Sequence, residues 1–283
     1  MRISPIIEAY ELMKIYKNSD VMIFDVSNSK NAKYNYETEH IEGAYFADLN
    51  TQLAGNTNNF SEGGRHPLPK IENFAKTLTD LGISKNKHIV IYDDKNGSNA
   101  SARFWWMLKS VGHEKVQVLN GGLTQAKNNN LPLSSKRERV QRVSEPYQID
   151  KWNLPTIEIS EVDSVSLNPN YLVVDVRDKE RFDGIFEPID LVAGHIPGAV
   201  NIPYTENLDP NGLFLDPIKL RNKYETIFGD INIENIVVHC GSGVTACHTI
   251  LALDYAEMGT PKLYVGSWSE WSRNNKVIEK TKA

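Results

Sequence analysis

The chain has 283 residues, of which 40% are hydrophobic, 24% charged and 9% aromatic. This length predicts roughly two domains that each bury a core, and the composition excludes disordered, collagen-like and coiled-coil proteins. The formal net charge of -5 gives no attraction to phosphate backbones or to anionic lipid, so we expect no nucleic acid and no membrane as partners.

The N-terminal residues predict no export signal. Glu8 and Glu11 follow the start closely, and no apolar run has the length of a signal peptide core or of a membrane span. The cysteines, Cys240 and Cys247, are too few for a disulfide framework and suit a reducing compartment. We therefore expect a soluble, cytoplasmic protein with at least one thiol free to react.

The sequence repeats itself, which predicts two domains of one fold. Four segments of the first half match four of the second in the same order: 21–26 with 171–176, 40–44 with 195–199, 88–93 with 235–240, and 118–122 with 264–267. Serine, charged residues and proline break the apolar periodicity between the halves. We expect a first domain at residues 1–133, a charged linker at 134–155 and a second domain at 156–283.

In each half, short runs rich in Val and Ile alternate with longer stretches of helical spacing, which predicts parallel strands joined by crossover helices. In the first half, a strand at 89–92 leads through the polar loop 93–98 into a helix. In the second half, a strand at 236–239 ends at Cys240, and the helix that follows ends near Gly259. The predicted fold class is α/β, with a mainly parallel sheet and helices on both faces in each of two tandem domains.

Cys240 lies where a predicted parallel strand ends and a helix begins, the edge at which open α/β sheets bind ligands. Gly241 and Gly243 flank Ser242, so the backbone can curl and direct successive N–H groups inward, an arrangement that attracts anions. With the positive end of the following helix, these groups would stabilise a nucleophilic thiolate. Cys247 lies on an apolar face of that helix, where we expect it to pack in the core.

The length of the cysteine loop also allows a phosphatase or an arsenate reductase. Cysteine phosphatases carry a phosphate-clamping arginine six positions after the nucleophile, where this chain has Ala246. Without that cation a doubly charged phosphate loses its main partner, so the loop favours a smaller group such as one sulfur atom.

The segment 240–245 resembles the active-site loop of the two-domain rhodanese-like sulfurtransferases, most closely their 3-mercaptopyruvate branch. Segments 40–44 and 195–199 resemble the family signature near the start of each domain, and 266–271 resembles its C-terminal signature. The resemblance covers nearly the whole chain. It implies that the second domain is catalytic and that the first has lost its cysteine, with Asp93 at the equivalent position.

The resemblance further implies covalent sulfur transfer without a metal or an organic cofactor. The Cys240 thiolate would take the sulfur of a small-molecule donor, 3-mercaptopyruvate, leaving pyruvate and a Cys240 persulfide. A thiol such as reduced thioredoxin, or cyanide in an assay, would then accept the sulfur. The backbone amides of the loop would bind the donor and stabilise the negative charge of the persulfide. These amides belong to Gly241, Gly243, Val244 and Thr245.

Arg181 matches a substrate-binding arginine of the mercaptopyruvate branch, so we expect it to bind the donor carboxylate. Arg177 is a second candidate for binding the donor, although its position nearer the strand favours a structural role in which it ties loops together. The branch has a further carboxylate-binding arginine nine positions after Arg181, where this chain has Asp190. Either a neighbouring cation substitutes for that arginine, or the donor preference has moved to thiosulfate or another persulfide.

Ser242 and His66 resemble the serine and histidine that form a proton relay with the cysteine in mercaptopyruvate enzymes, with His66 contributed by the first domain. Asp48 also matches a family position at the domain interface. The alternative is that His66 and Asp48 are exposed loop residues. His40 and His195 recur once per domain, which favours a structural hydrogen bond in each repeat.

Three classes of function therefore stay open. The first is a sulfurtransferase that uses 3-mercaptopyruvate or thiosulfate. The second is a noncatalytic persulfide-carrying or binding module, because duplicated domains can become docking surfaces. The third is the phosphatase or arsenate reductase. A metal site is not expected, because Asp25 and Asp175 at the strand ends lack a cluster of His and Cys with ligand spacing.

Overall fold

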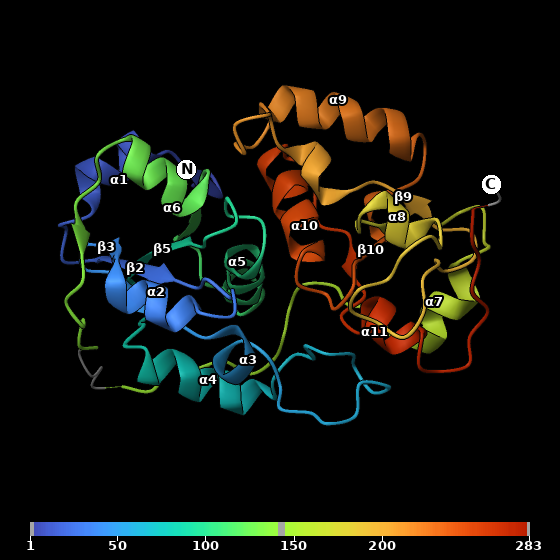
Figure 1. The fold of residues 1–283 in the computed structure, drawn as a ribbon, viewed down its shortest axis with the longest axis horizontal. Helices are drawn as coiled ribbons and strands as arrows, with labels where there is room; N and C mark the ends of the chain where they lie inside the picture. Colours follow the sequence, from blue (N-terminus) through green and yellow to red (C-terminus); the bar gives the residue numbers. More distant parts are fainter. Residues whose placement is uncertain (1–2, 141–144, 282–283) are drawn as a thin grey trace. The chain divides into compact units, whose positions relative to one another are not determined.

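The structure, a computed structural model, describes residues 3–140 and 145–281. The chain forms two compact units, which are described separately (Figure 1). Unit 1 consists of Met1–Gly55, Pro69–Asn153 and Pro210–Phe214. Unit 2 consists of Asn56–Leu68, Leu154–Asp209 and Leu215–Ala283.

The units differ from the predicted domains at two segments. Asn56–Leu68 falls within the predicted first domain, 1–133, but belongs to unit 2. Hydrogen bonds within unit 2 hold this loop, because backbone amides removed from water need an acceptor. The amide of Gly63 donates to Glu270 Oε1 at 2.7 Å. Pro210–Phe214 falls within the predicted second domain but belongs to unit 1.

The predicted linker, residues 134–155, is assigned to unit 1 as far as Asn153. Tyr147 is only 4% exposed, and its amide donates to Thr79 Oγ1 at 2.9 Å. The chain passes into unit 2 after Asn153. Within the described part of this stretch, Tyr147 is buried and the ring centroid of Trp152 lies 5.0 Å from that of Phe74, whereas most of the charged residues are exposed.

Unit 1 contains a five-stranded parallel sheet with the strand order β1-β6-β5-β2-β4. Its strands are β1 (Ile6–Ile7), β2 (Val21–Asp25), β4 (Tyr45–Phe46), β5 (His88–Tyr92) and β6 (Val116–Leu119). A separate antiparallel pair joins β3 (His40–Ile41) and β7 (Leu133–Ser134). The helices are α1 (Ala9–Ile15), α2 (Ala32–Thr38), α3 (Leu49–Gln52), α4 (Ile71–Asp80), α5 (Ala100–Ser110) and α6 (Gly122–Asn128).

Helices cover both faces of this sheet (Figure 1). Successive side chains of β2 point to opposite faces, and those of residues 22–25 are all buried, so both faces need a cover. Ile23 shares one buried cluster with Leu12 of α1 and Ala126 of α6. Phe24 packs on the other face against Phe104 of α5, with the ring centroids 5.8 Å apart in an edge-to-face arrangement.

Unit 2 contains a four-stranded parallel sheet with the strand order β11-β10-β8-β9. Its strands are β8 (Leu172–Asp175), β9 (Val200–Asn201), β10 (Ile236–His239) and β11 (Lys262–Leu263). The α-helices are α7 (Ile159–Val165), α8 (Lys179–Phe182), α9 (Pro217–Phe228), α10 (Ala246–Tyr255) and α11 (Ser267–Trp271), and the short 3-10 turns are η1 (Tyr204–Asn207) and η2 (Ile233–Asn235).

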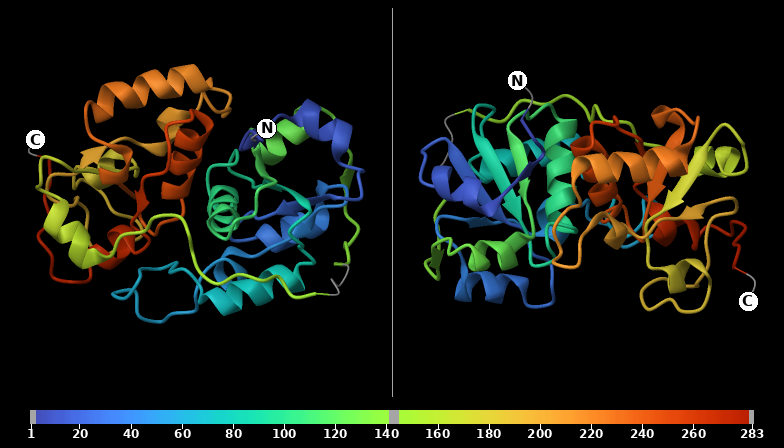
Figure 2. Two further views of the ribbon diagram at one scale, coloured as in Figure 1. Left: turned by 180° about the vertical axis from the view of Figure 1, so that it is seen from behind. Right: turned by 90° about the horizontal axis from the view of Figure 1, so that it is seen from above.

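The unit 2 sheet is also covered on both faces (Figure 2). Val173 and Val237 share one buried cluster with Val162 of α7 and Trp268 of α11. On the opposite face α10 packs against β10, and α9 packs against α10. The predicted α/β fold with two similar domains is confirmed.

The repeats in the sequence correspond to the same position in each sheet. The strand before Asp93, β5, lies between β2 and β6, and the strand before Cys240, β10, lies between β8 and β11. His40 and His195 each bond their Nδ1 atom to a carbonyl oxygen in their own unit, at 2.6 Å from Tyr36 and 2.8 Å from Phe182, respectively. These contacts fit the structural role expected for both histidines.

None of the helices in the described part of the chain has the length and apolarity needed to cross a membrane.

Candidate active site

The cysteine loop of unit 2 connects the carboxyl end of β10 to the start of α10. Cys240 is 2% exposed, and the amide of Ser242 approaches its Sγ atom at 3.5 Å. Gly243 has a φ of +72°, and a Cβ there would lie 2.5 Å from the carbonyl oxygen of Val265. Only glycine fits that position, so the tight curl expected from the sequence depends on this residue.

Hydrogen bonds from the first turn of α11 hold the cysteine loop in place. The carbonyl oxygen of Cys240 accepts from the amide of Trp268 at 3.0 Å, and that of Gly241 accepts from Ser269 at 2.9 Å. Ser267 Oγ accepts from the amide of Cys240 at 3.2 Å. The segment that resembles a C-terminal family signature is therefore a support for the cysteine loop.

Val244 and Thr245 lead the loop into α10. Their carbonyl oxygens accept from the amides of Cys247 and His248, both at 3.1 Å. Cys247 is fully buried, and its thiol donates to the carbonyl oxygen of Gly243 at 3.3 Å. Cys247 is thus packed in the core and braces the loop.

His66 lies beside the loop because the segment 56–68 folds as part of unit 2. Its Nδ1 atom is 2.8 Å from Ser242 Oγ, so the structure brings these two predicted site residues together. Gly64, with a φ of +74°, sits so close to α11 that a Cβ would lie 2.3 Å from the carbonyl oxygen of Gly266. This close approach fixes the segment that carries His66.

A cluster of charged side chains surrounds Asp190, whose side chain is fully buried. Arg65 Nη1 bonds to Asp190 Oδ1, Arg181 Nη2 lies 3.3 Å from Oδ2, and Arg273 Nη1 lies 3.1 Å from Oδ1. Glu187 accepts from Arg181 Nε at 3.0 Å with both carboxylate oxygens. We call these five residues the arginine cluster.

The electrostatics of the cluster favour its charged forms. Burial alone would lower the pKa of Arg181, but the hydrogen bond and charge of Glu187, with the charges of Asp190 and Cys240, raise it. Burial alone would raise the pKa of Glu187, but hydrogen bonds from Arg181 and from the amide of Asp190 hold it below its ordinary value. Arg181 therefore stays cationic within the electrostatic reach of the Cys240 sulfur.

Arg177, the other predicted substrate arginine, has its donors occupied by protein oxygens. Its Nε atom is 3.0 Å from each carboxylate oxygen of Asp175, and Nη2 donates to the carbonyl oxygen of Gly194 at 2.6 Å. Its Nη1 atom is 3.3 Å from Glu187 Oε2. Arg177 is 2% exposed, so it ties the loops of this sheet edge together.

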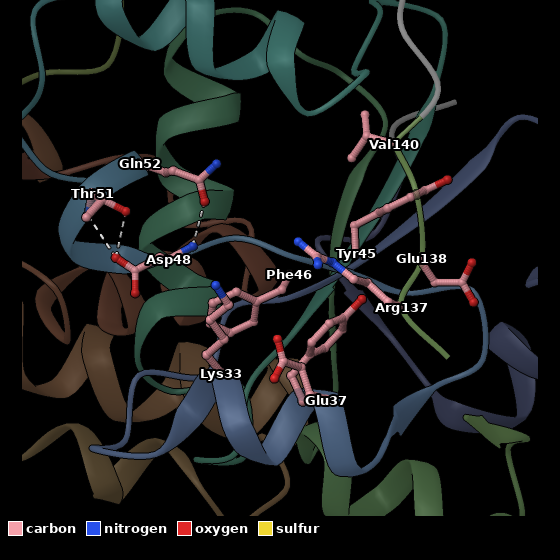
Figure 3. A pocket seen from close by; sticks show the side chains of 11 residues that line it. Lys33, Glu37, Tyr45, Phe46, Asp48, Thr51, Gln52, Arg137, Glu138 and Val140 are labelled. Atoms are coloured by element: carbon pink, nitrogen blue, oxygen red, sulfur yellow. Dashed lines mark hydrogen bonds between the residues drawn. The ribbon is translucent and has the colours of Figure 1, made fainter. Parts of the chain in front are cut away.

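Asp48 belongs to unit 1 and is not among the residues around Cys240 within unit 2. It caps α3, where its Oδ1 atom accepts from the amide of Thr51 at 2.8 Å and from the hydroxyl at 2.9 Å. Asp48 lines a cavity of about 480 Å³ together with Lys33, Glu37 and Arg137 (Figure 3). The cavity mixes both charges with aromatic side chains, and no cysteine is among its described lining residues.

Unit 1 holds a carboxylate where unit 2 holds its cysteine. Asp93 is fully buried, and its oxygens accept from the amides of Lys95, Gly97, Asn99 and Ser101 at 2.9, 2.9, 3.1 and 3.2 Å and from the hydroxyl of Ser101 at 2.7 Å. The loop of unit 1 is thus an anion-binding nest filled by its own side chain.

Sequence reasoning missed three members of the arginine cluster, Arg65, Arg273 and Glu187. Arg65 immediately precedes His66, so the only signal for it was its place beside a predicted site residue. Asp190 was noted as an acid at an expected arginine position, but its partners lie far away in sequence. No group of three or more His, Cys, Asp or Glu that could hold a metal occurs in residues 3–140 and 145–281.

A family model for the rhodanese-like domain matches residues 8–129 and again residues 159–274. A probable 3-mercaptopyruvate sulfurtransferase from Pseudomonas aeruginosa is 38% identical over 83% of this chain and 82% of its own length. The 3-mercaptopyruvate sulfurtransferase of Mus musculus is 36% identical over 86% of this chain and 80% of its own length. The crystal structure of SseA from Escherichia coli, described as a 3-mercaptopyruvate sulfotransferase, superposes with a TM-score of 0.78 at 29% identity, over 95% of this chain and 100% of the other.

Proposed function

This chain belongs to the rhodanese-like family, and on that premise we propose that it is a sulfurtransferase that moves sulfur from 3-mercaptopyruvate through a Cys240 persulfide to a thiol. The observation that carries the proposal is the surroundings of Cys240. A loop amide faces its sulfur, a Ser242–His66 pair stands beside it, and the Arg181 guanidinium lies within its electrostatic reach. The names of the relatives support the choice of donor.

In the first step the Cys240 thiolate attacks the sulfur of the donor. A sulfur–sulfur bond forms, the carbon–sulfur bond of the donor breaks, and the electron pair of that bond passes to the donor carbon as the enolate of pyruvate. The thiol proton of the donor ends on that carbon, which completes pyruvate. We assign the transfer of this proton to Ser242 and His66, whose atoms are 2.8 Å apart.

In the second step an acceptor removes the outer sulfur and restores the Cys240 thiolate. Cyanide yields thiocyanate, a monothiol yields its persulfide, and a dithiol such as reduced thioredoxin yields a disulfide and hydrogen sulfide. The Cys240 sulfur carries the transferred sulfur atom through both steps. The proposed reaction therefore needs neither a metal nor an organic cofactor. The free thiols of Cys240 and Cys247 support a reducing compartment such as the cytoplasm.

Thiosulfate is the second candidate donor, and a specific residue favours it. Asp190 stands where the mercaptopyruvate branch has an arginine, so a donor carboxylate would lose one cationic partner there, and thiosulfate, which has no carboxylate to place, would become the preferred donor if no other cation replaced that arginine. In that case Cys240 would take the outer sulfur of thiosulfate and release sulfite. The persulfide on the enzyme and the second step would be the same.

Initial rates with both donors, each at saturating cyanide and then with a dithiol acceptor, test the proposal. We expect a higher kcat/KM for 3-mercaptopyruvate than for thiosulfate. A reversed order would make thiosulfate the donor. Intact mass after donor addition separates an enzyme from a persulfide-carrying module, because a carrier keeps one added sulfur and shows little multiple turnover.

A further inference from the structure

Two guanidinium groups lie against the residue that follows the nucleophile. A Cβ built on Gly241 would be 3.2 Å from Arg65 Nη2 and from Arg181 Nη2, and 3.6 Å from Arg181 Nη1. Gly241 is not among the glycines with a positive φ, so its backbone conformation does not require glycine, and its lack of a side chain leaves room for these two groups. Arg65 and Arg181 therefore flank the same side of the cysteine loop.

Each of the two guanidinium groups bonds to a carboxylate through some of its nitrogens and keeps one terminal nitrogen available for a ligand. Arg65 bonds to Asp190 through Nη1, and Arg181 bonds to Glu187 through Nε and Nη2. Within residues 3–140 and 145–281, no protein atom accepts a hydrogen bond from Arg65 Nη2 or Arg181 Nη1. Their side chains are 17% and 12% exposed, so a small solute can reach them.

The backbone fixes Arg65 in this place. Its amide donates to Ser269 Oγ at 3.0 Å, and the preceding Gly64 packs against α11. The carboxylate of Asp190 then selects the direction of the side chain. Because three guanidinium groups and two carboxylates form the arginine cluster, one positive charge is left over for an anion.

Arg273 is the third arginine of the cluster, and none of its atoms is among the three nearest to a Cβ built on Gly241. Its Nη1 atom donates to Asp190 Oδ1 at 3.1 Å and to the carbonyl oxygen of Ser269 at 2.7 Å. Its guanidinium group lies over the ring of Phe60, 5.5 Å from the centroid. Arg273 thus shares with Arg65 a bond to Asp190 Oδ1, and it offers a matched control for Arg65.

We propose that Arg65 is the second carboxylate-binding residue of this site and that Asp190 is its positioning residue. The inference rests on the proposed function. The cation that other members of the mercaptopyruvate branch carry at position 190 is supplied here from the segment 56–68, and Asp190 aims it at the donor. Arg65 Nη2 and Arg181 Nη1 together bind the carboxylate of a 2-oxo acid donor, with its sulfur toward Cys240.

The test compares 3-mercaptopyruvate with 1-mercaptopropan-2-one, which keeps the ketone and the thiol but has a methyl group in place of the carboxylate. Loss of a hydrogen bond to a charged group predicts that Arg65→Gln lowers kcat/KM for 3-mercaptopyruvate about 10- to 100-fold. The same variant leaves kcat/KM for the uncharged donor nearly unchanged. Arg273→Gln affects the two donors equally.

Equal losses with both donors in Arg65→Gln, or the same discrimination in Arg273→Gln, would overturn the role of Arg65. If Arg65→Gln fails to fold, Arg65→Lys serves instead. Its single ammonium group keeps the charge beside Asp190 but cannot bond to Asp190 and the donor in the fork geometry of arginine. A selective loss for the carboxylate donor is expected there too, and its absence counts against the proposal.

Calorimetric binding of pyruvate separates this inference from the proposed function. We expect pyruvate to bind the wild type and to bind Arg65→Gln more weakly, and unchanged binding in that variant would overturn the inference. A wild type that binds pyruvate through Arg65 but does not turn over 3-mercaptopyruvate would overturn the proposed function and support the inference.

Discussion

His66 Nδ1 lies 2.8 Å from Ser242 Oγ, although the two residues are 176 positions apart in the sequence. The contact exists because the segment 56–68 leaves the first sequence repeat and packs on α11 of unit 2. Ser242 in turn sits two residues after Cys240, with its amide toward the sulfur. In the proposed reaction, the pair therefore places a group that can carry a proton next to the attacking sulfur.

If the pair moves the donor proton, Ser242→Ala and His66→Gln should each lower kcat with 3-mercaptopyruvate by about 100-fold. Thiosulfate releases sulfite without taking up a proton, so kcat with that donor should fall much less. The double variant should be about as slow as either single variant, because both residues act in one transfer. Equal losses with both donors would indicate that the pair only shapes the loop.

The two cysteines should respond differently to the same substitution. Cys240→Ser removes the nucleophile, so turnover with any donor should fall below detection and no sulfur should add in intact mass. Cys247→Ser keeps a donor for the carbonyl oxygen of Gly243, so most of the activity should remain, with a loss of about 1 kcal/mol in the free energy of unfolding. Equal losses of activity would contradict the assignment of Cys240.

Asp190 should be important for stability as well as for binding. Asp190→Asn leaves three arginine side chains around a buried position without their carboxylate. Breaking a buried ion pair in this way predicts a loss of about 3 to 5 kcal/mol in the free energy of unfolding, measured with urea. Asp163→Asn breaks an exposed pair with Lys276 in the same unit and should cost less than about 1 kcal/mol.

The fold could be predicted from the sequence because it depends on local patterns that occur twice. Strands rich in Val and Ile, and glycines at the turn after β10, specify the sheet and the edge where Cys240 lies. The exchange of Asn56–Leu68 and Pro210–Phe214 between the units could not be predicted, because it depends on single long-range hydrogen bonds such as Gly63 to Glu270.

The site was predictable where family motifs cover it, at Cys240, Ser242 and His66, and not at the arginine cluster. Arg65 and Asp190 are 125 positions apart, and no periodicity or turn signal connects them. The acid at position 190 looked like a loss of a substrate contact. In the structure its side chain is fully buried and bonds to three arginines, and these contacts, which only the fold reveals, are the basis of its proposed positioning role.

Asp93 should stabilise unit 1 through its nest of amides. Asp93→Asn replaces one accepting oxygen by an NH₂ group that faces N–H donors, so at least one charge-assisted hydrogen bond is lost. We expect a decrease of about 2 kcal/mol in the free energy of unfolding. The neighbouring Asp94 is exposed, and Asp94→Asn should change stability little. Equal losses of stability in the two variants would show that the nest of amides makes Asp93 no more stabilising than an exposed carboxylate.

Glu187 should make the stability of unit 2 depend on pH. Its pKa is lower in the folded chain than its ordinary value of 4.5, because Arg181 and nearby amides favour the carboxylate despite its burial. The folded state therefore binds fewer protons, and the stabilisation is present above pH 4.5 and is lost as the pH falls through the folded pKa. Glu187→Gln should thus be less stable than the wild type in urea at neutral pH, and the difference should shrink in acid. Glu180→Gln, at an exposed position of α8, should show no such trend; a gap for Glu187→Gln that stays constant with pH would contradict the proposed charge pairing.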